Sequence, residues 1–241
     1  MMRPRIAIPV PHSADAEYSG RALPQYERAV EQAGGEPVRI PLDRAIAEVQ
    51  KLAQHCDAVL LPGSRADVDP EKYLAARDPK TADADWPRDT IDQFLLQDVY
   101  HLRKPVLGIC YGLQSLNVYR SGSLVQHIES TINHEAGRKV AAAHDVVVDA
   151  GSRLAEILTQ ASADPTRVPV NSSHHQSAEA VGKGLRIVAR CPQDGIVEAL
   201  EGTDPDHFVL AVQWHPERSI DDDEASRAIF RSLVEAAKKN A

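Results

Sequence analysis

Residues 105–118 read Pro-Val-Leu-Gly-Ile-Cys-Tyr-Gly-Leu-Gln-Ser-Leu-Asn-Val. The apolar run from Val106 to Ile109 is typical of a buried strand, and the stretch after Gly112 has the composition of a helix. Cys110 therefore stands at a sharp strand-to-helix turn, which lifts its side chain above the edge of a sheet. Because the positive end of the following helix favours an ionised thiol, we expect Cys110 to be a reactive nucleophile.

Short apolar runs alternate with helical patterns through the first half of the chain. These segments are residues 5–8, 23–33, 37–40, 46–52, 58–61 and 91–102. Such alternation predicts an α/β fold with a parallel sheet covered by helices.

The second half changes character, because Gly, Pro and Asp separate short strand-like runs. These runs are residues 145–148, 168–170, 185–189, 196–200 and 208–212. They predict antiparallel additions to the sheet. An amphipathic pattern from Glu224 to Lys238 predicts a closing helix.

The chain has 241 residues and a formal net charge of −8, with 43% hydrophobic and 26% charged residues. The length suits one large α/β domain spanning residues 1–241. Since no long basic block is present, binding to nucleic acid or to a membrane surface is disfavoured, and small molecules are the expected partners. The N-terminus leads into a short strand, and no stretch approaches about 18 uninterrupted apolar residues, so we expect a cytoplasmic protein.

Three cysteines, Cys56, Cys110 and Cys191, stand far apart in the sequence. Because no Cys-x-x-Cys pair occurs, their spacing signals neither a disulfide framework nor a zinc site. We expect Cys56 and Cys191 to be small buried apolar residues. Only Cys110 has the local context of a nucleophile.

A thiol nucleophile needs a base and a group that orients the base. The strand-like run ending at Val212 leads into His215-Pro216-Glu217. If His215 lies at the strand end, Glu217 can reach one imidazole nitrogen while the other nitrogen faces Cys110. Taken alone, the His-Pro-Glu segment is also compatible with a capped turn.

Acyl transfer also needs backbone N–H groups that stabilise the oxyanion. Tyr111, directly after the nucleophile, can offer one such group. The turn Pro62-Gly63-Ser64 follows a predicted strand and can offer a second, because Gly63 lets the backbone approach closely. A simple turn is the alternative interpretation of this segment.

Polar residues 171–176, Asn-Ser-Ser-His-His-Gln, follow another predicted strand. Neighbouring side chains in an extended segment point to opposite faces, so His174 and His175 are poorly placed to share a metal ion. A substrate contact and a solvated loop remain open for this cluster. Gln114 and Gln126 can bind a polar substrate or serve the structure alone.

Residues 65–87 form the longest loop-like segment. It follows directly after a predicted strand end, where ligand sites of α/β sheets lie. Two interpretations remain open, a solvated surface loop and a flap that borders the site.

Together these segments resemble the class I glutamine amidotransferase-like superfamily, and specifically its gamma-glutamyl-gamma-aminobutyrate hydrolase branch. The resemblance spans nearly the whole chain. The matching segments are residues 61–64, 67–70, 88–89, 108–118, 122–126, 170–176 and 215–217. The cysteine turn and the His-Pro-Glu segment match the superfamily, and the Asn-Ser-x-His-His-Gln cluster matches the hydrolase branch.

The resemblance implies a three-layer, flavodoxin-like fold with a twisted, mostly parallel sheet. It implies Cys110 as nucleophile, His215 as general base and acid, Glu217 as its orienting partner, and backbone amides of Ser64 and Tyr111 as the oxyanion hole. The substrate-binding residues that we expect are Gly63, Gln114, His174 and His175.

By the same resemblance, the protein hydrolyses a gamma-glutamyl amide through a thioester, in the chemistry of polyamine catabolism, with no metal or organic cofactor. The resemblance is also compatible with a homo-oligomer. Two positions depart from the branch: Tyr111 stands where many members have Arg, and Ser121-Gly122 replaces a Gly-Gly pair. Two alternatives are a glutaminase subunit that supplies ammonia to a synthetase partner and a non-catalytic binding module on the same fold.

Overall fold

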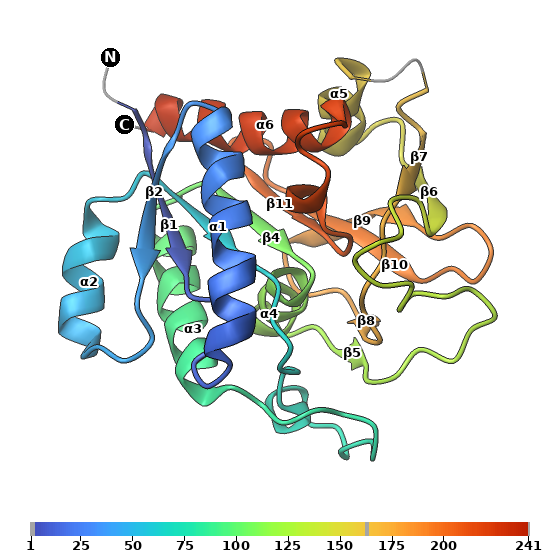
Figure 1. The fold of residues 1–241 in the computed structure, drawn as a ribbon, viewed down its shortest axis with the longest axis horizontal. Coiled ribbons are helices and arrows are strands. Elements are labelled where there is room, and N and C mark those ends of the chain that lie inside the picture. Colours follow the sequence, from blue (N-terminus) through green and yellow to red (C-terminus); the bar gives the residue numbers. More distant parts are fainter. Residues whose placement is uncertain (1–2, 162–163, 241) are drawn as a thin grey trace.

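The computed structural model describes residues 3–161 and 164–240, and a nine-stranded sheet with helices on both faces runs through this part of the chain (Figure 1). The strand order is β2-β1-β3-β4-β11-β10-β9-β6-β7. The first five strands in this order are parallel. The other four are antiparallel to their neighbours. The predicted α/β class with antiparallel additions in the second half is therefore confirmed.

The strands of this sheet include most of the segments predicted from the sequence. They are β1 (Arg5–Pro9), β2 (Glu36–Ile40), β3 (Ala58–Leu61), β4 (Val106–Ile109), β6 (His144–Val148), β7 (Arg167–Val170), β9 (Leu185–Arg190), β10 (Val197–Gly202) and β11 (Val209–Val212). A separate two-stranded ribbon, which the sequence analysis missed, pairs β5 (Leu124–Val125) with β8 (Ser177–Ala178).

Six helices and two short 3₁₀ turns are found in the described part of the chain. They are α1 (Ala16–Gln32), α2 (Ile46–Gln54), α3 (Trp86–His101), α4 (Tyr111–Tyr119), α5 (Arg153–Thr159) and α6 (Glu224–Asn240), with 3₁₀ turns at Pro70–Tyr73 and Pro216–Arg218. Helices α1, α5 and α6 contribute to the apolar core on one face of the sheet. Helices α2, α3 and α4 contribute to the core on the other face.

Two helices begin several residues before the positions that apolar periodicity indicated. The Asp15 carboxylate accepts a hydrogen bond from the Tyr18 amide at 2.8 Å and caps α1. Asp85 caps α3 in the same way, with Pro87 in the first turn. Capping side chains satisfy amides that have no partner within the helix, so they determine where a helix begins even when the first turn is polar.

Three neighbouring parallel strands, β3, β4 and β11, end at the same edge of the sheet. Their register pairs Leu61 with Gly108 and Ile109 with Val212. The residues that follow these strands must therefore lie close together, which is where ligands bind in α/β sheets. In the described chain no helix combines the length and apolar character needed to cross a membrane.

Candidate active site

Cys110 lies between β4 and α4 in a backbone conformation that non-glycine residues rarely adopt, with φ 53° and ψ −106°. Such a conformation costs about 1–3 kcal/mol and persists only where surrounding contacts enforce it. Here the Cys110 amide donates to the Val212 carbonyl at 2.9 Å, and the Cys110 carbonyl accepts from the amides of Leu113 and Gln114. A Cβ atom on Gly112 would lie 2.2 Å from the Leu61 carbonyl oxygen, so glycine is needed for α4 to pack this close to β3.

His215 follows β11, and its Nδ1 lies 2.8 Å from the Glu217 Oε1 atom. The 3₁₀ turn that starts at Pro216 brings the carboxylate back to the ring. Asn171 holds the backbone of His215 on both sides: its Nδ2 donates to the His215 carbonyl at 2.8 Å, and its Oδ1 accepts from the His215 amide at 3.0 Å. These contacts fix the position and the tautomer of the imidazole.

Gly63 provides a measure of how close the two reactive side chains lie. A Cβ atom added to Gly63 would lie 2.9 Å from His215 Cε1 and 3.6 Å from Cys110 Cβ. His215 Cε1 and Cys110 Cβ therefore both lie next to Gly63, in the turn after β3. Any larger residue at position 63 would displace the His215 ring.

Burial controls the protonation states of these groups. It raises the pKa of Cys110 to about 12, although the positive charge of Arg218 and a hydrogen bond from the Tyr111 backbone act in the opposite direction. It also lowers the pKa of His215, against the attraction of Glu217. For Glu217 itself, burial acts to raise the pKa, but His215 and Arg218 outweigh it, so the pKa is lowered.

The helix start favours the thiolate as expected, because the hydrogen bond from the Tyr111 backbone acts to lower the pKa of Cys110, but burial outweighs this contribution. The free energy lost when a thiolate is removed from water is larger than the stabilisation that one helix N-terminus provides. The raised pKa of Cys110 and the lowered pKa of His215 both favour the uncharged forms of the two side chains at neutral pH.

The turn after β3 is held by Arg88, a fully buried residue of α3. Its Nη2 donates to the Pro62 carbonyl at 2.6 Å, its Nη1 donates to the Pro11 carbonyl at 2.9 Å, and its Nε pairs with Asp92 at 2.7 Å. The guanidinium also lies 5.0 Å from the centre of the Tyr111 ring. The sequence showed Arg88 only as part of the resemblance, and the tertiary structure gives it a positioning role.

The backbone amides of Tyr111 and Ser64, which were predicted to form the oxyanion hole, lie in different surroundings. The Tyr111 amide begins α4 directly beside the thiol and hydrogen-bonds to it. Gly63 uses its own amide to donate to the Tyr26 hydroxyl at 3.1 Å. The Ser64 amide donates to no acceptor within residues 3–161 and 164–240, and its role in an oxyanion hole stays a prediction.

The two neighbouring histidines contact different groups, as the extended segment predicts. His174 Nδ1 lies 3.0 Å from the Gln176 carbonyl, whereas His175 Nε2 lies 3.1 Å from Asp67. Gln114 is buried, and its amide nitrogen already faces the Gln176 carbonyl and the Gln213 side chain. These contacts favour a structural role for Gln114.

The long loop before α3 is attached to the rest of the site. Gln126 accepts hydrogen bonds from the Asp78 amide at 2.8 Å and the Thr81 hydroxyl at 2.9 Å. Asp67 is buried and contacts His175. These contacts favour a segment that borders the site over a free surface loop, and they give Gln126 a structural role.

Arg218 is a site residue that the sequence analysis did not identify. It directly follows the His-Pro-Glu segment, its Nη1 donates to the Ser173 hydroxyl at 2.8 Å, and its Nε lies 3.5 Å from Glu217. Arg138 is close enough that the charge of Arg218, after burial, lowers its pKa. The signal in the sequence was only a cation next to the motif, which is common by chance.

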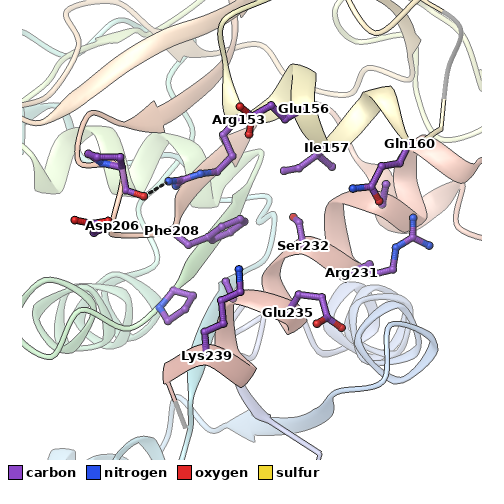
Figure 2. Close-up of a pocket in the computed structure, with 14 residues that line it drawn as sticks. Arg153, Glu156, Ile157, Gln160, Asp206, Phe208, Arg231, Ser232, Glu235 and Lys239 are labelled. Atoms are coloured by element: carbon purple, nitrogen blue, oxygen red, sulfur yellow. Dashed lines mark hydrogen bonds between the residues drawn. The ribbon is translucent and has the colours of Figure 1, made fainter.

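A large cavity of about 620 Å³ lies elsewhere, between α5, α6 and the loop before β11 (Figure 2). Its lining includes Pro105, which precedes β4, whereas Cys110 follows β4. The cavity therefore lies toward the opposite edge of the sheet from the thiol. Side chains of both charges line it, among them Arg153, Glu156 and Lys239.

Comparisons with known proteins identify the family of the chain. The chain is 38% identical to a putative glutamine amidotransferase of Mycobacterium tuberculosis over 88% of this chain, and it spans 66% of that protein, just under two thirds. It is 33% identical to the gamma-glutamyl-gamma-aminobutyrate hydrolase of Escherichia coli K12, over 89% of this chain and 85% of that protein. The crystal structure of a putative GMP synthase component from Thermoplasma acidophilum has the same fold, with a TM-score of 0.65 at 15% identity over 99% of this chain and 96% of the other. Residues 8–217 match the Peptidase C26 family model, so the chain belongs to this family of glutamine amidotransferase-like hydrolases.

Proposed function

We propose that the protein hydrolyses gamma-glutamyl amides, with Cys110 as nucleophile, His215 as base and acid, and Glu217 as the orienting carboxylate. The observation that carries this proposal is that Cys110 and His215, 105 positions apart in the chain, both lie against Gly63. The name of the Escherichia coli relative supports the substrate class.

The reaction starts when the Cys110 sulfur attacks the gamma-carbonyl carbon and its proton moves to His215. The carbonyl oxygen becomes an oxyanion, stabilised by the amides of Tyr111 and Ser64. His215 then protonates the amine as the carbon–nitrogen bond breaks, which leaves a thioester on Cys110. Water attacks the thioester while His215 accepts a proton, and glutamate and the free thiol result.

The glutamyl half of the substrate carries an alpha-carboxylate, which needs cationic or amide donors. Arg218 lies beside Glu217 and has spare donor capacity beyond its bond to Ser173. We assign it, with Arg138, to this carboxylate. A positive charge here also stabilises the ionised sulfur as the reaction proceeds.

The test is a panel of gamma-glutamyl amides with different amines, including gamma-glutamyl-gamma-aminobutyrate and glutamine, offered to the isolated chain. We expect release of glutamate from at least one member and a mass-shifted acyl-enzyme on Cys110 when turnover is stopped with acid. A folded chain that hydrolyses no member of the panel and does not react with an electrophilic glutamine analogue would point to a non-catalytic module.

A second candidate is a glutaminase that delivers ammonia to a synthetase. The name of the Mycobacterium tuberculosis relative is the observation that favours it. In that case glutamine is the preferred member of the panel. Turnover of other gamma-glutamyl amides at higher kcat/KM than glutamine would contradict this candidate.

A further inference from the structure

A second group of ionisable side chains lies in the antiparallel half of the molecule, around Glu198 of β10. The Glu198 side chain is 0% exposed, and three histidine side chains, each at most 2% exposed, surround it. The distances to Glu198 Oε1 are 3.0 Å from His144 Nε2, 3.4 Å from His134 Nδ1 and 3.5 Å from His174 Nε2. The proposed hydrolysis uses none of these four side chains as a reacting group.

The hydrogen bonds on the far sides of two rings determine what faces Glu198. His134 Nε2 lies 2.8 Å from the Asp194 carboxylate, which can only accept, so Nε2 carries the hydrogen. His174 Nδ1 lies 3.0 Å from the Gln176 carbonyl, which also accepts. In the neutral tautomers that follow, both remaining ring nitrogens turn a lone pair toward Glu198.

These inward-facing atoms make no hydrogen bond among the described residues, although the two ring nitrogens lie 3.4 and 3.5 Å from Glu198 Oε1. His134 Nδ1, His174 Nε2 and Glu198 Oε2 are all buried without a hydrogen bond. Lone pairs that converge on a buried carboxylate repel one another and lose their hydration, which is costly in a low-dielectric interior. A cation between them removes the repulsion.

We propose that His134 Nδ1, His174 Nε2 and the Glu198 carboxylate bind a divalent transition-metal ion of the zinc class. Two imidazoles and a carboxylate are a ligand set that zinc accepts. In a tetrahedral site with bonds of about 2.0–2.1 Å, neighbouring ligand atoms lie about 3.4 Å apart. The two nitrogen–oxygen distances match this spacing, and the three ligand atoms lie within 4.8 Å of one another.

The surroundings supply the contacts that orient metal ligands. Ligating histidines usually donate their other N–H to a carboxylate or a backbone carbonyl, and Asp194 and the Gln176 carbonyl take these positions. His144 lies within hydrogen-bonding distance of Glu198 Oε1, so it orients the carboxylate.

A neighbouring set, His134 with Cys191 and Asp194, is less suited to hold the ion. Asp194 already accepts from Ser130 and His134, and the Cys191 thiol donates to Gln193 at 3.1 Å. Their polar atoms are therefore engaged, whereas His134 Nδ1, His174 Nε2 and Glu198 Oε2 make no hydrogen bond.

A cavity borders the proposed site. A cavity of about 270 Å³ is lined by residues 127–128, 130–135 and 174–175, which include both ligating histidines. The segment that carries His174 also carries Asn171, which holds the backbone of His215. The ion would therefore fix a segment that positions the base, without contacting the substrate.

The test uses the full chain with Cys110→Ala, so that the active-site thiol cannot bind metal. After removal of metal with a chelator, the chain is dialysed against Zn²⁺ and its metal content is measured. We expect one ion per chain. His134→Ala and His174→Ala should each weaken binding by at least about 10²-fold, since each removes a direct ligand.

The matched controls are His127→Ala and His175→Ala, which change histidines at the same cavity that are not ligands. They should bind one ion with affinity near that of the parent chain, and so should Cys191→Ala. Circular dichroism reports whether each variant is folded.

A measurement on the Cys110→Ala chain itself avoids the risk that a ligand variant unfolds. Co²⁺ bound in place of Zn²⁺ should show tetrahedral absorption bands without a sulfur-to-cobalt charge-transfer band. The proposal is overturned by a sulfur band, by unchanged binding in folded His134→Ala and His174→Ala, or by no bound ion. The last result would mean that protons, not a metal, fill the space around Glu198.

Discussion

The parallel and antiparallel halves of the sheet each gather ionisable side chains, but by different routes. In the parallel half, Cys110, His215 and the turn at Gly63 follow three adjacent strands, β4, β11 and β3. In the antiparallel half, Glu198 lies within β10, His144 begins β6, and His134 and His174 come from loops. Parallel strands bring all their carboxyl ends to one edge, so short motifs suffice there, whereas the second group depends on packing between distant segments.

The largest expected effect tests whether the parallel edge alone carries the chemistry. Cys110→Ala should lower hydrolysis of the best gamma-glutamyl substrate by at least about 10⁴-fold, because no other group can form the thioester. Steady-state assays of glutamate release check this. A folded Cys110→Ala variant that retains a tenth of the activity would show that the active site does not lie at this edge of the sheet.

The next prediction separates the two groups that follow β11. His215→Ala should reduce kcat/KM by about 10²-fold more than Glu217→Gln, since proton transfer contributes more than orientation. The Glu217→Gln substitution keeps the shape of the side chain and removes only its charge. Equal losses in the two variants would mean that Glu217 does more than orient the ring.

A third prediction concerns the buried support of this edge. Arg88→Met should lower the free energy of unfolding by about 3–5 kcal/mol, because Asp92 is left buried and unpaired. The double variant Arg88→Met with Asp92→Leu should recover most of this stability, but not activity, since the Pro62 carbonyl still lacks its donor. Chemical denaturation and the hydrolysis assay are both needed.

The matched control for Arg88 is Lys238→Met, which breaks an exposed pair with Glu235. It should change the free energy of unfolding by less than about 1 kcal/mol. A double variant no more stable than Arg88→Met alone would contradict the assigned role of the ion pair.

The smallest effect is on the pH profile. Because burial lowers the pKa of His215, the acid limb of kcat/KM should lie below pH 6.5, the ordinary histidine value. No increase in kcat/KM should appear near pH 9, the ordinary pKa of a thiol, since the pKa of Cys110 is raised to about 12.

Two substitutions test the electrostatic cause of this profile. Glu217→Gln should move the acid limb to lower pH, and Arg218→Met should move it to higher pH, as each removes one charge acting on the ring. Shifts in the same direction would contradict this electrostatic account.

Much of the parallel half could be predicted from the sequence. The bend at Cys110 and the pairing of His215 with Glu217 follow from residues adjacent in the chain, and both are found. Helix beginnings were misplaced because caps such as Asp15 precede the apolar pattern. Helix α5 and the β5–β8 ribbon were missed, since short elements show too little periodicity to identify.

The thiol shows how local and tertiary effects can oppose each other. The helix after Cys110 favours the thiolate and is visible in the sequence, whereas burial, which outweighs it, depends on the whole fold. The contact of Arg88 with Pro62 and the position of Arg218 likewise required the packed structure.

The sequence by itself determined the α/β class, the sharp turn at Cys110 and the pairing of His215 with Glu217, because strand and turn patterns are local and parallel strands must align their ends. Only the tertiary structure decided the protonation of Cys110, the support of the Gly63 turn and the convergence of three histidines on Glu198. These depend on burial and on contacts between residues far apart in the chain, and no local pattern encodes the desolvation that governs them.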